Sequence, residues 1–228
     1  MSITKDECER ILGERFYGFG SWNAKYWFIG PEQGQGKDEN DELTLRCEAF
    51  QELEEDGLCD CRDFHLRVGV PAATKWYRAN KSGDVPLQQT WRRLMRCLFA
   101  YLSDKPFSNR DLRKYQVEQL GQKKSDTCLV ELCGLPARSF RVERDRDKYL
   151  DSRLDRLMCK LNENPPEFVV IYGKKYQHRW MDKLRSQTLQ AGDGGLWHLG
   201  RTRIGFIDTP HGQPNYEWDE LGRKLRAV

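Results

Sequence analysis

The stretch Lys25-Tyr26-Trp27-Phe28-Ile29-Gly30 (residues 25–30) is a short apolar run that leads into a glycine-rich loop. It is too short for a typical helix and is rich in aromatic and β-branched residues, as expected of a buried strand. Three later runs have the same character, at residues 127–133 (TCLVELC), 167–172 (EFVVIY) and 203–208 (RIGFID). We therefore predict four buried strands.

Helical patterns lie between these strands. One stripe of apolar residues, at spacings of three and four, runs from Leu87 to Leu102, and a second runs from Leu150 to Leu161. Weaker helical signals cover residues 39–55, 174–190 and 216–226. Strands that alternate with helices predict an α/β fold of three layers, α/β/α, in which helices cover both faces of a central four-stranded, mostly parallel sheet.

The length of 228 residues suits a single domain over residues 1–228. Residues 57–86 are the least regular part, and we expect a long functional loop or a small insertion there. The 38 Lys and Arg residues are nearly balanced by 35 Asp and Glu residues, which gives a net charge of +3. This balance excludes a histone-like polycation, so a nucleic-acid-binding surface would have to be local.

The first fifteen residues are charged and amphipathic and do not resemble a signal peptide. No apolar run approaches the ~20 residues of a membrane span. We therefore expect a cytoplasmic protein, with a bacterial cytosol favoured, whose eight cysteines are reduced thiols. The tightest cysteine pair, Cys59-Asp60-Cys61, is a weak metal signal without a C-x-x-C partner, so we expect no metal and no cofactor.

Ligands of open parallel sheets bind at the carboxyl ends of the strands. The segments that follow the four predicted strands therefore hold the candidate site residues. These segments are residues 30–37 (GPEQGQGK), 134–139 (GLPARS), 173–175 (GKK) and 209–215 (TPHGQPN).

In this order, the segments resemble the uracil-DNA glycosylase superfamily, and the resemblance spans most of the chain. It implies a uracil-DNA glycosylase-like fold, with Glu32 in the position that serves the attacking water and His211 opening the last catalytic loop. Glu131 matches the base-reading position, where the family commonly has Asn, and Gly173 ends the third strand as expected. The residues after His211 depart from the usual Pro-Ser, being Gly212 and Gln213. These departures put uracil in doubt as the substrate.

The resemblance assigns catalytic roles to Glu32 and His211. Cleavage of an N-glycosidic bond builds positive charge on the sugar and negative charge on the leaving base. The Glu32 carboxylate can stabilise the cation and orient or deprotonate water, and the His211 imidazole can hydrogen-bond the departing base. The alternatives are a solvated loop acid for Glu32 and a helix-capping histidine for His211.

We expect Glu131 and Gln33 to bind the base. An ionised Glu131 would repel a carbonyl acceptor on uracil, whereas it can accept a hydrogen bond from the N4 amine of cytosine. The alternative is a buried Glu131 paired with Arg138 or another cation. The first interpretation predicts a cytosine derivative enlarged at C5, such as glucosylated hydroxymethylcytosine. Because such bases occur in phage DNA, it further suggests a role in antiviral defence.

Further residues are expected to contact DNA, which is the predicted partner; no obligate protein partner is evident. Backbone N–H groups and lysines that can hold phosphates are Gly34, Gly36, Lys37, Gly173, Lys174 and Lys175. Candidates for a wedge that fills the gap left by a flipped base are Gln213, Asn215 and Tyr216. Candidates for stacking on a base or strand are Trp76 and Tyr77, beside the cation Arg78. An ordinary turn and a core aromatic cluster are the alternatives for the last two groups.

Three other functions compete with excision of a modified cytosine. The first is a repair glycosylase for uracil or a damaged base. The second is a catalytically inactive glycosylase fold that binds DNA or a protein, which the missing Pro-Ser favours. The third is an enzyme acting on free nucleotides, with residues 34–37 as a phosphate loop, although the G-x-x-x-x-G-K-[ST] pattern is absent.

Overall fold

A computed structural model of the chain describes residues 3–34, 39–81, 83–137, 146–173, 176–187, 189–192, 195–210 and 213–227, with side chains except at residues 32–34, 39–41, 137 and 146–147. The helices are α1 (Lys5–Arg15), α2 (Glu39–Leu53), α3 (Cys61–Val68), α4 (Pro71–Thr74), α5 (Gln89–Leu102), α6 (Asn109–Glu118), the 3-10 helix η1 (Arg146–Tyr149), α7 (Leu150–Glu163), α8 (Gln177–Arg185) and α9 (Asn215–Ala227). The strands are β1 (Gly18–Phe19), β2 (Tyr26–Gly34), β3 (Leu58–Cys59), β4 (Thr127–Ala137), β5 (Phe168–Tyr172), β6 (Leu189–Ala191), β7 (Trp197–Leu199) and β8 (Thr202–Ile207).

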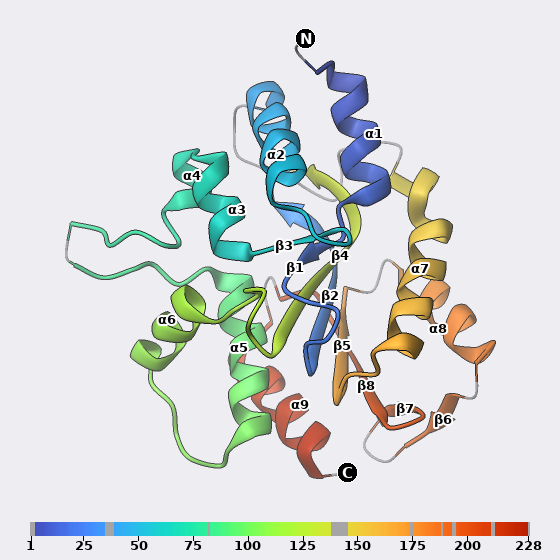
Figure 1. Ribbon diagram of the computed structural model, residues 1–228. Coiled ribbons are helices and arrows are strands. Elements are labelled where there is room, and N and C mark those ends of the chain that lie inside the picture. The colour runs from blue at the N-terminus through green and yellow to red at the C-terminus, as the bar shows by residue number, and fades with distance from the viewer. Residues whose placement is uncertain are drawn as a thin grey trace.

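All these strands belong to one sheet, in the order β3-β1-β4-β2-β5-β8-β7-β6 (Figure 1). The central four, β4-β2-β5-β8, are parallel and match the four predicted strands. The predicted strand number was too small, because the sheet has eight strands and not four. The additional strands at the two edges have only two or three residues each, too few to form a recognisable apolar run.

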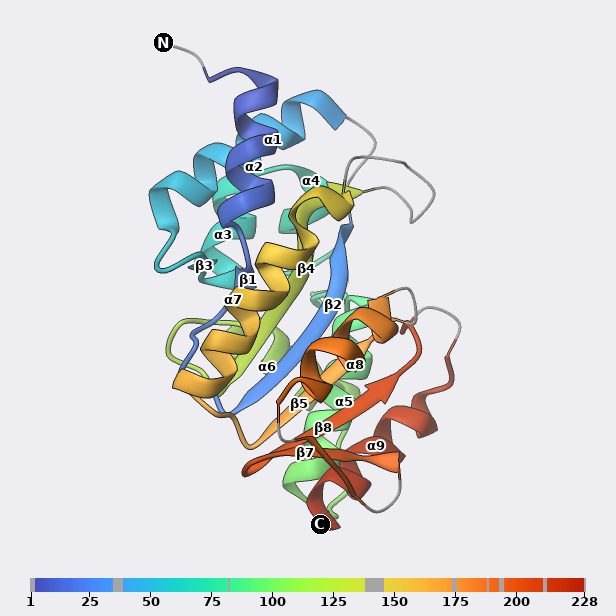
Figure 2. The ribbon, with the colours of Figure 1, turned by 90° about the vertical axis from the view of Figure 1, so that its right-hand side faces the viewer.

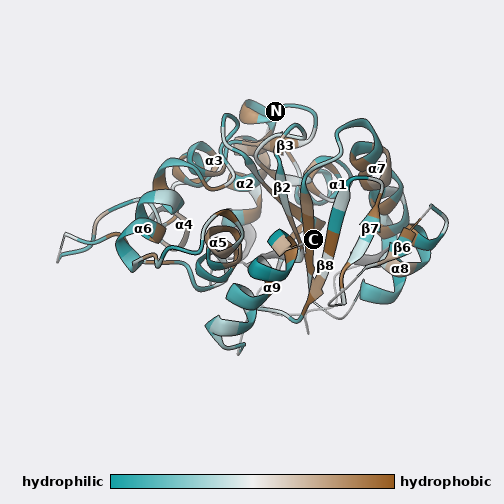
Figure 3. Cartoon of the chain, turned by 90° about the horizontal axis from the view of Figure 1, so that it is seen from below, coloured by the Kyte–Doolittle hydropathy of each residue, from teal (hydrophilic) through white to brown (hydrophobic). Residues whose placement is uncertain are grey.

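Helices cover both faces of the sheet, as predicted for an α/β fold. Side chains alternate along each strand, so Phe28 lies on one face while Trp27 and Ile29 lie on the other. The Phe28 face packs against α1, α2, α3, α5 and α9, and the Trp27 face packs against α7 and α8. Figure 3 shows this arrangement from below, with α5 and α9 on one side of β8 and α7 and α8 on the other.

The two strongest helical stripes form α5 and α7, and the three weaker signals coincide with α2, α8 and α9 to within a few residues at each end. The expectation for residues 57–86 was partly wrong, because the segment contains β3, α3 and α4. Its side chains Phe64 and Tyr77 are buried in the core of the Phe28 face. Most of this stretch is therefore part of the packed fold.

A buried arginine on α7 connects three parts of the chain. Arg153 is 1% exposed. Its guanidinium donates hydrogen bonds to the carbonyl oxygens of Gly13 (2.9 Å), Phe16 (2.7 Å), Glu131 (2.6 Å) and Leu132 (2.7 Å). A buried charge needs such partners. Arg153 therefore holds the end of α1 and the middle of β4 against α7, and fixes the backbone at Glu131.

Among the described helices, none combines the length and the apolar character that crossing a bilayer requires.

Candidate functional site

The connections of the central strands diverge between β2 and β5. From β2 the chain crosses the Phe28 face and enters β4 on one side, whereas from β5 it crosses the Trp27 face through α8 and enters β8 on the other. Figure 2 shows β2, β5 and β8 side by side. Such a divergence opens a crevice at the carboxyl ends of the strands, where open α/β sheets bind ligands.

A row of four residues crosses the sheet at this point of divergence. Gly30 on β2 is in register with Glu131 on β4. On the other side of β2, Ile29 is in register with Ile171 of β5, so the next residue, Tyr172, lies beside Gly30. Tyr172 is in register with Ile207, the last residue of β8. The row Glu131–Gly30–Tyr172–Ile207 therefore lies at the carboxyl ends of β5 and β8 and crosses β2 and β4 near their middle, since these two strands continue to Gly34 and Ala137.

Gly30 leaves space that the Tyr172 side chain occupies. A Cβ atom at Gly30 would lie 2.2 Å from both the Oη and the Cζ of Tyr172. The Tyr172 ring thus covers β2, and its hydroxyl lies one strand from Glu131. The ring of Trp218 on α9 packs edge-on against Tyr172, with centroids 6.2 Å apart.

Glu131 is buried, with 8% of its surface exposed. Its charge acts on groups around it. Burial raises the pKa of Tyr172 well above its usual value, and the negative charge of Glu131 adds to this effect. Burial likewise raises the pKa of the Cys61 thiol on α3, and the charge of Glu131 again contributes. The predicted base-reading carboxylate thus lies between Tyr172 on one side and α3 on the other.

The backbone of Glu32 lies close to this row. Glu32 is in register with Cys133, two positions beyond the pair formed by Gly30 and Glu131. The register shifts between Glu32 and Gly34, and Gly34 then pairs with Ala137. The side chains of Glu32 and of Gln33 lie outside what the structure describes.

The loop that was predicted to carry the catalytic histidine begins next to Tyr172, because Ile207, the register partner of Tyr172, ends β8. His211 itself, the predicted histidine, is outside the described residues, as is Gly212. Other predicted residues outside the described part are Gly36, Lys37, Arg138, Lys174 and Lys175. Gly173 is described; it has a left-handed φ of 97°, which favours glycine, and lies beside Pro31 and Thr209.

The three wedge candidates differ in exposure. The backbone oxygen of Gln213 accepts a hydrogen bond from Arg93 Nε at 3.0 Å, and Asn215 begins α9. Tyr216 in the first turn of α9 is 62% exposed, whereas most large apolar side chains of the described chain are buried. Of the three, Tyr216 has the size and the exposure that a wedge requires.

The stacking candidates are placed differently from one another. Tyr77 is 8% exposed and its hydroxyl donates to Cys61 Sγ at 3.1 Å, so its predicted contact with DNA is corrected to a place in the core. Trp76 is half-buried beneath Lys75, whose Nζ lies 4.4 Å from the ring centroid. Arg78 is exposed. In the turn that ends α4, Tyr77 thus packs into the core and Trp76 packs partly against it, while Lys75 and Arg78 face outward.

Sequence reasoning missed a buried polar group on α2 and α3. Arg46 donates to Glu42 Oε1 at 2.7 and 3.0 Å, and both side chains are at most 6% exposed. His65 shares a 2.6 Å hydrogen bond with the Cys61 carbonyl, so its Nδ1 carries the proton. Burial, and then the charge of Arg46, lowers the pKa of His65 to about 4.

A signal for this group was present in the sequence. Cys61, Phe64, His65 and Val68 recur at helical spacings and are the buried residues of α3. The segment is only eight residues long, so its pattern is weak beside those of α5 and α7.

Within the described part of the chain, no group of three or more His, Cys, Asp or Glu side chains is arranged to hold a metal ion. Seven of the eight cysteines, Cys59 and Cys61 included, are buried free thiols, and Cys159 is exposed.

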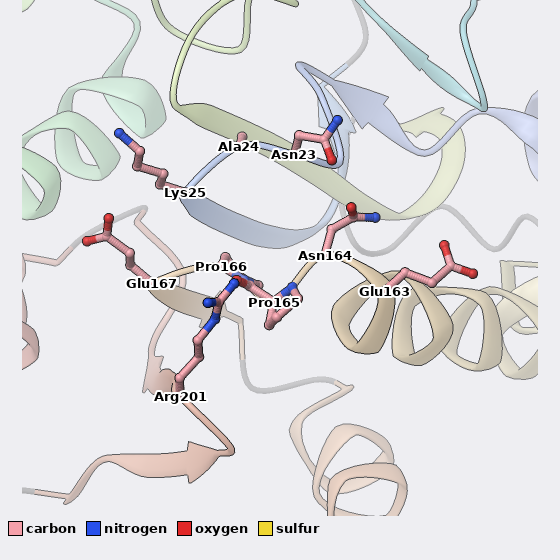
Figure 4. Close-up of a pocket in the computed structure, with 9 residues that line it drawn as sticks. All are labelled: Asn23, Ala24, Lys25, Glu163, Asn164, Pro165, Pro166, Glu167 and Arg201. Atoms are coloured by element: carbon pink, nitrogen blue, oxygen red, sulfur yellow. The ribbon is translucent and has the colours of Figure 1, made fainter.

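A separate pocket of about 400 Å³ lies at the amino ends of the central strands (Figure 4). Lys25, Glu167 and Arg201, which line it, directly precede β2, β5 and the start of β8. It therefore faces the amino ends of the strands, away from the row that contains Glu131. None of the predicted site residues lines it.

Comparison of the chain with known protein families and with curated proteins finds no match.

Proposed function

We propose that the protein is a DNA glycosylase that takes a modified base out of the helical stack and hydrolyses its N-glycosidic bond to leave an abasic site. The base that the site fits best is a cytosine enlarged at C5, such as glucosylated hydroxymethylcytosine. One observation carries this proposal. Glu131, which matches the base-reading position of the uracil-DNA glycosylase superfamily, is a buried carboxylate in the middle of β4, in the same row as Tyr172 and Ile207, where β5 and β8 end.

A carboxylate in this position favours cytosine over uracil. It can accept a hydrogen bond from the N4 amine of cytosine, while it would repel the carbonyl that uracil has at the same place. The Tyr172 hydroxyl lies nearby over Gly30. Because the pKa of Tyr172 is raised, the hydroxyl keeps its proton and remains a hydrogen-bond donor. The two groups together offer one acceptor and one donor for the base.

The proposed chemistry needs a carboxylate near the sugar and a donor near the leaving base. We assign these roles to Glu32 and His211, following the resemblance. The register supports the first assignment, since Glu32 lies two residues beyond Gly30 on the same strand. The start of the β8 loop beside Tyr172 supports the second. Glu32 would stabilise the cationic sugar and orient water, and His211 would hydrogen-bond the departing base.

Base flipping needs a side chain to fill the vacated place in the duplex. Tyr216 is proposed for this role. Its 62% exposure at the start of α9, five residues after His211, supports the assignment.

The test is an excision assay on four duplexes that differ in one base: uracil, cytosine, 5-hydroxymethylcytosine, or its glucoside. Alkali then cleaves the strand at any abasic site. The proposal expects cleavage with the glucoside and none with unmodified cytosine. Absence of cleavage on every duplex at high enzyme concentration would contradict a glycosylase and favour an inactive fold that binds DNA or a protein. Cleavage of the uracil duplex alone would indicate a repair glycosylase.

Three variants test the site. Glu32→Gln and His211→Ala should each remove activity while the protein stays folded. Glu131→Gln should weaken excision of the modified cytosine by about 10-fold or more, the effect of roughly 1.4 kcal/mol. The matched control is Glu48→Gln on the exposed side of α2, which should leave activity unchanged. If Glu131→Gln and Glu48→Gln have equal activity, Glu131 does not read the base.

The proposed biological setting is defence against phages. Excision of ordinary cytosine would destroy the cell's own DNA, so the group added at C5 must decide specificity. Expression of the protein should reduce plaque formation by a phage whose DNA contains glucosylated hydroxymethylcytosine, and the Glu32→Gln variant should not. Equal protection against a phage with unmodified cytosine would contradict this setting.

A further inference from the structure

Two neighbouring arginines at the start of α5 have no acidic partner. Within the part of the chain that the structure describes, neither Arg92 nor Arg93 forms an ion pair with a carboxylate, and both side chains are partly exposed. The contrast is with Arg96, one turn further along α5, which is paired with Asp219 of α9. The uncompensated charge is therefore confined to the first turn and a half of α5.

Their placement makes this charge costly. The amino terminus of a helix carries the positive end of the helix dipole, and α5 has no acidic residue in its first turn. The two guanidinium groups also repel each other, and burial followed by the charge of Arg92 lowers the pKa of Arg93. Positive charge gathered at a positive helix end is stabilised when an anion binds there.

The hydrogen-bond donors of the two guanidinium groups are only partly satisfied. Arg93 donates from Nε to the carbonyl oxygen of Gln213 at 3.0 Å and from Nη1 to that of Gln89 at 3.1 Å. The Nε atom of Arg92 is buried, and among the described residues it has no hydrogen-bond partner. A buried guanidinium nitrogen without a partner is rare in proteins, because it forfeits the hydrogen bonds that water would supply.

The pair lies at the edge of the candidate site. The bond from Arg93 to Gln213 joins the start of α5 to the loop that carries His211, two residues before Gln213. The helices α5 and α9 run side by side from this point (Figure 1). The exposed Tyr216 lies in the first turn of α9.

We propose that Arg92 and Arg93 form a phosphate-binding site that holds the DNA backbone beside the nucleotide that is flipped. The choice of DNA as the source of the phosphate rests on the proposed function. Arg93 also positions the Gln213 carbonyl, so its contact with phosphate would couple the backbone of the DNA to the loop that carries His211. Guanidinium groups suit this role because they bind phosphate oxygens through paired N–H donors.

The experiment measures binding without excision. Fluorescence anisotropy with an unmodified 20-base-pair duplex gives Kd over a range of salt concentrations for wild type, Arg92→Gln and Arg93→Gln. Each phosphate contact contributes about 0.9 to the slope of log Kd against log salt. Each variant should therefore bind several-fold more weakly and lower the slope by about one, while Arg93→Lys, which retains the charge, should retain most of the slope.

The matched control is Arg110→Gln, which removes an exposed arginine in the first turn of α6. That helix begins after the far end of α5, which lies about 15 Å from Arg92 by the rise of an α-helix. This variant should bind DNA like wild type. Thermal unfolding of each variant, followed by circular dichroism, establishes that it is folded. Arg92→Gln removes no hydrogen bond or ion pair among the described residues, so it remains informative if Arg93→Gln is unstable.

Two outcomes would overturn the proposal. One is an equal salt slope for Arg92→Gln, Arg93→Gln and Arg110→Gln. The other is a loss of ATP or pyrophosphate binding in the arginine variants with unchanged duplex binding, which would make the ligand a free nucleotide. The duplex contains no modified base, so the binding measurement stays valid even if the excision assay finds no activity. If the protein is an active glycosylase but binds the duplex equally well without the arginines, only the proposed phosphate site is wrong.

Discussion

The Tyr172 side chain occupies the space directly above Gly30, where a Cβ atom would lie 2.2 Å from the tyrosine hydroxyl. The two residues belong to neighbouring strands of the sheet, and Glu131 lies on the next strand in the same row. Gly30 is therefore required by the approach of a side chain, and not by a special backbone conformation. This contact fixes where the Tyr172 ring lies relative to Glu131 in the proposed site.

Gly30→Ala should destabilise the protein by about 1–3 kcal/mol, because the added methyl group must displace the buried Tyr172 ring. The measurement is the free energy of unfolding in urea. In Tyr172→Leu the ring is absent, so adding Gly30→Ala to that variant should cost clearly less than adding it to wild type. Equal costs in the two backgrounds would show that the contact is not the source of the effect.

Arg153→Met should destabilise the protein by about 3–5 kcal/mol, since it leaves four buried carbonyl oxygens without their donor. Arg153→Lys should fall between wild type and Arg153→Met, because an ammonium group donates fewer hydrogen bonds. The matched control is Arg156→Met on the same helix, where the side chain is 42% exposed and pairs with Asp56 at the surface. Its effect should stay within about 1 kcal/mol. Similar losses for Arg153→Met and Arg156→Met would contradict the role of Arg153 as a connection between α7, α1 and β4.

Stability should fall at acidic pH through His65. Its pKa is about 4 in the folded protein and about 6.5 when unfolded, so the unfolded chain binds the extra proton between these values. The stabilising contribution is complete above about pH 6.5 and is lost as the pH falls toward 4, by about 3 kcal/mol.

Urea unfolding at pH 7 and pH 4.5 measures this effect. His65→Gln should lose less stability over that interval than wild type, since it has no imidazole to protonate. The control is His178→Gln, which changes an exposed histidine of α8 and should lose as much stability as wild type. If His65→Gln and wild type lose the same free energy, His65 is not the group responsible.

Native protein should react with iodoacetamide at one cysteine, although the chain has eight. Cys159 is exposed, whereas burial raises the pKa values of Cys61 and Cys59, the latter to about 12, and excludes the reagent. Mass spectrometry should find one fast modification in buffer and eight in denaturant. Cys159→Ser should remove the fast reaction, and rapid labelling at a second position in buffer would contradict the burial of the other seven thiols.

Local sequence determined the central part of the fold. The strands β2, β4, β5 and β8 were recognisable because each buries a continuous apolar run, and α5 and α7 because their apolar stripes extend over more than three turns. Both signals depend only on residues close together in the chain. The strand ends were less well predicted, because β2 continues past Glu32 to Gly34 and β4 continues past Glu131 to Ala137.

Tertiary structure decided the rest. The strands at the sheet edges, β1, β3, β6 and β7, are too short to have a pattern of their own and exist because a longer strand offers them hydrogen-bond partners. Tyr77 looked like a surface aromatic beside cations, yet its contact with Cys61 places it inside.

The same distinction holds at the candidate site. A sequence can place Gly30, Glu131 and Tyr172 on three different strands, but it does not specify that they form one row, because register depends on how strands far apart in the chain pair. The charge at the start of α5 is equally invisible in the sequence. Whether Arg92, Arg93 or Arg96 has an acidic partner depends on which face of α5 the distant helix α9 packs against.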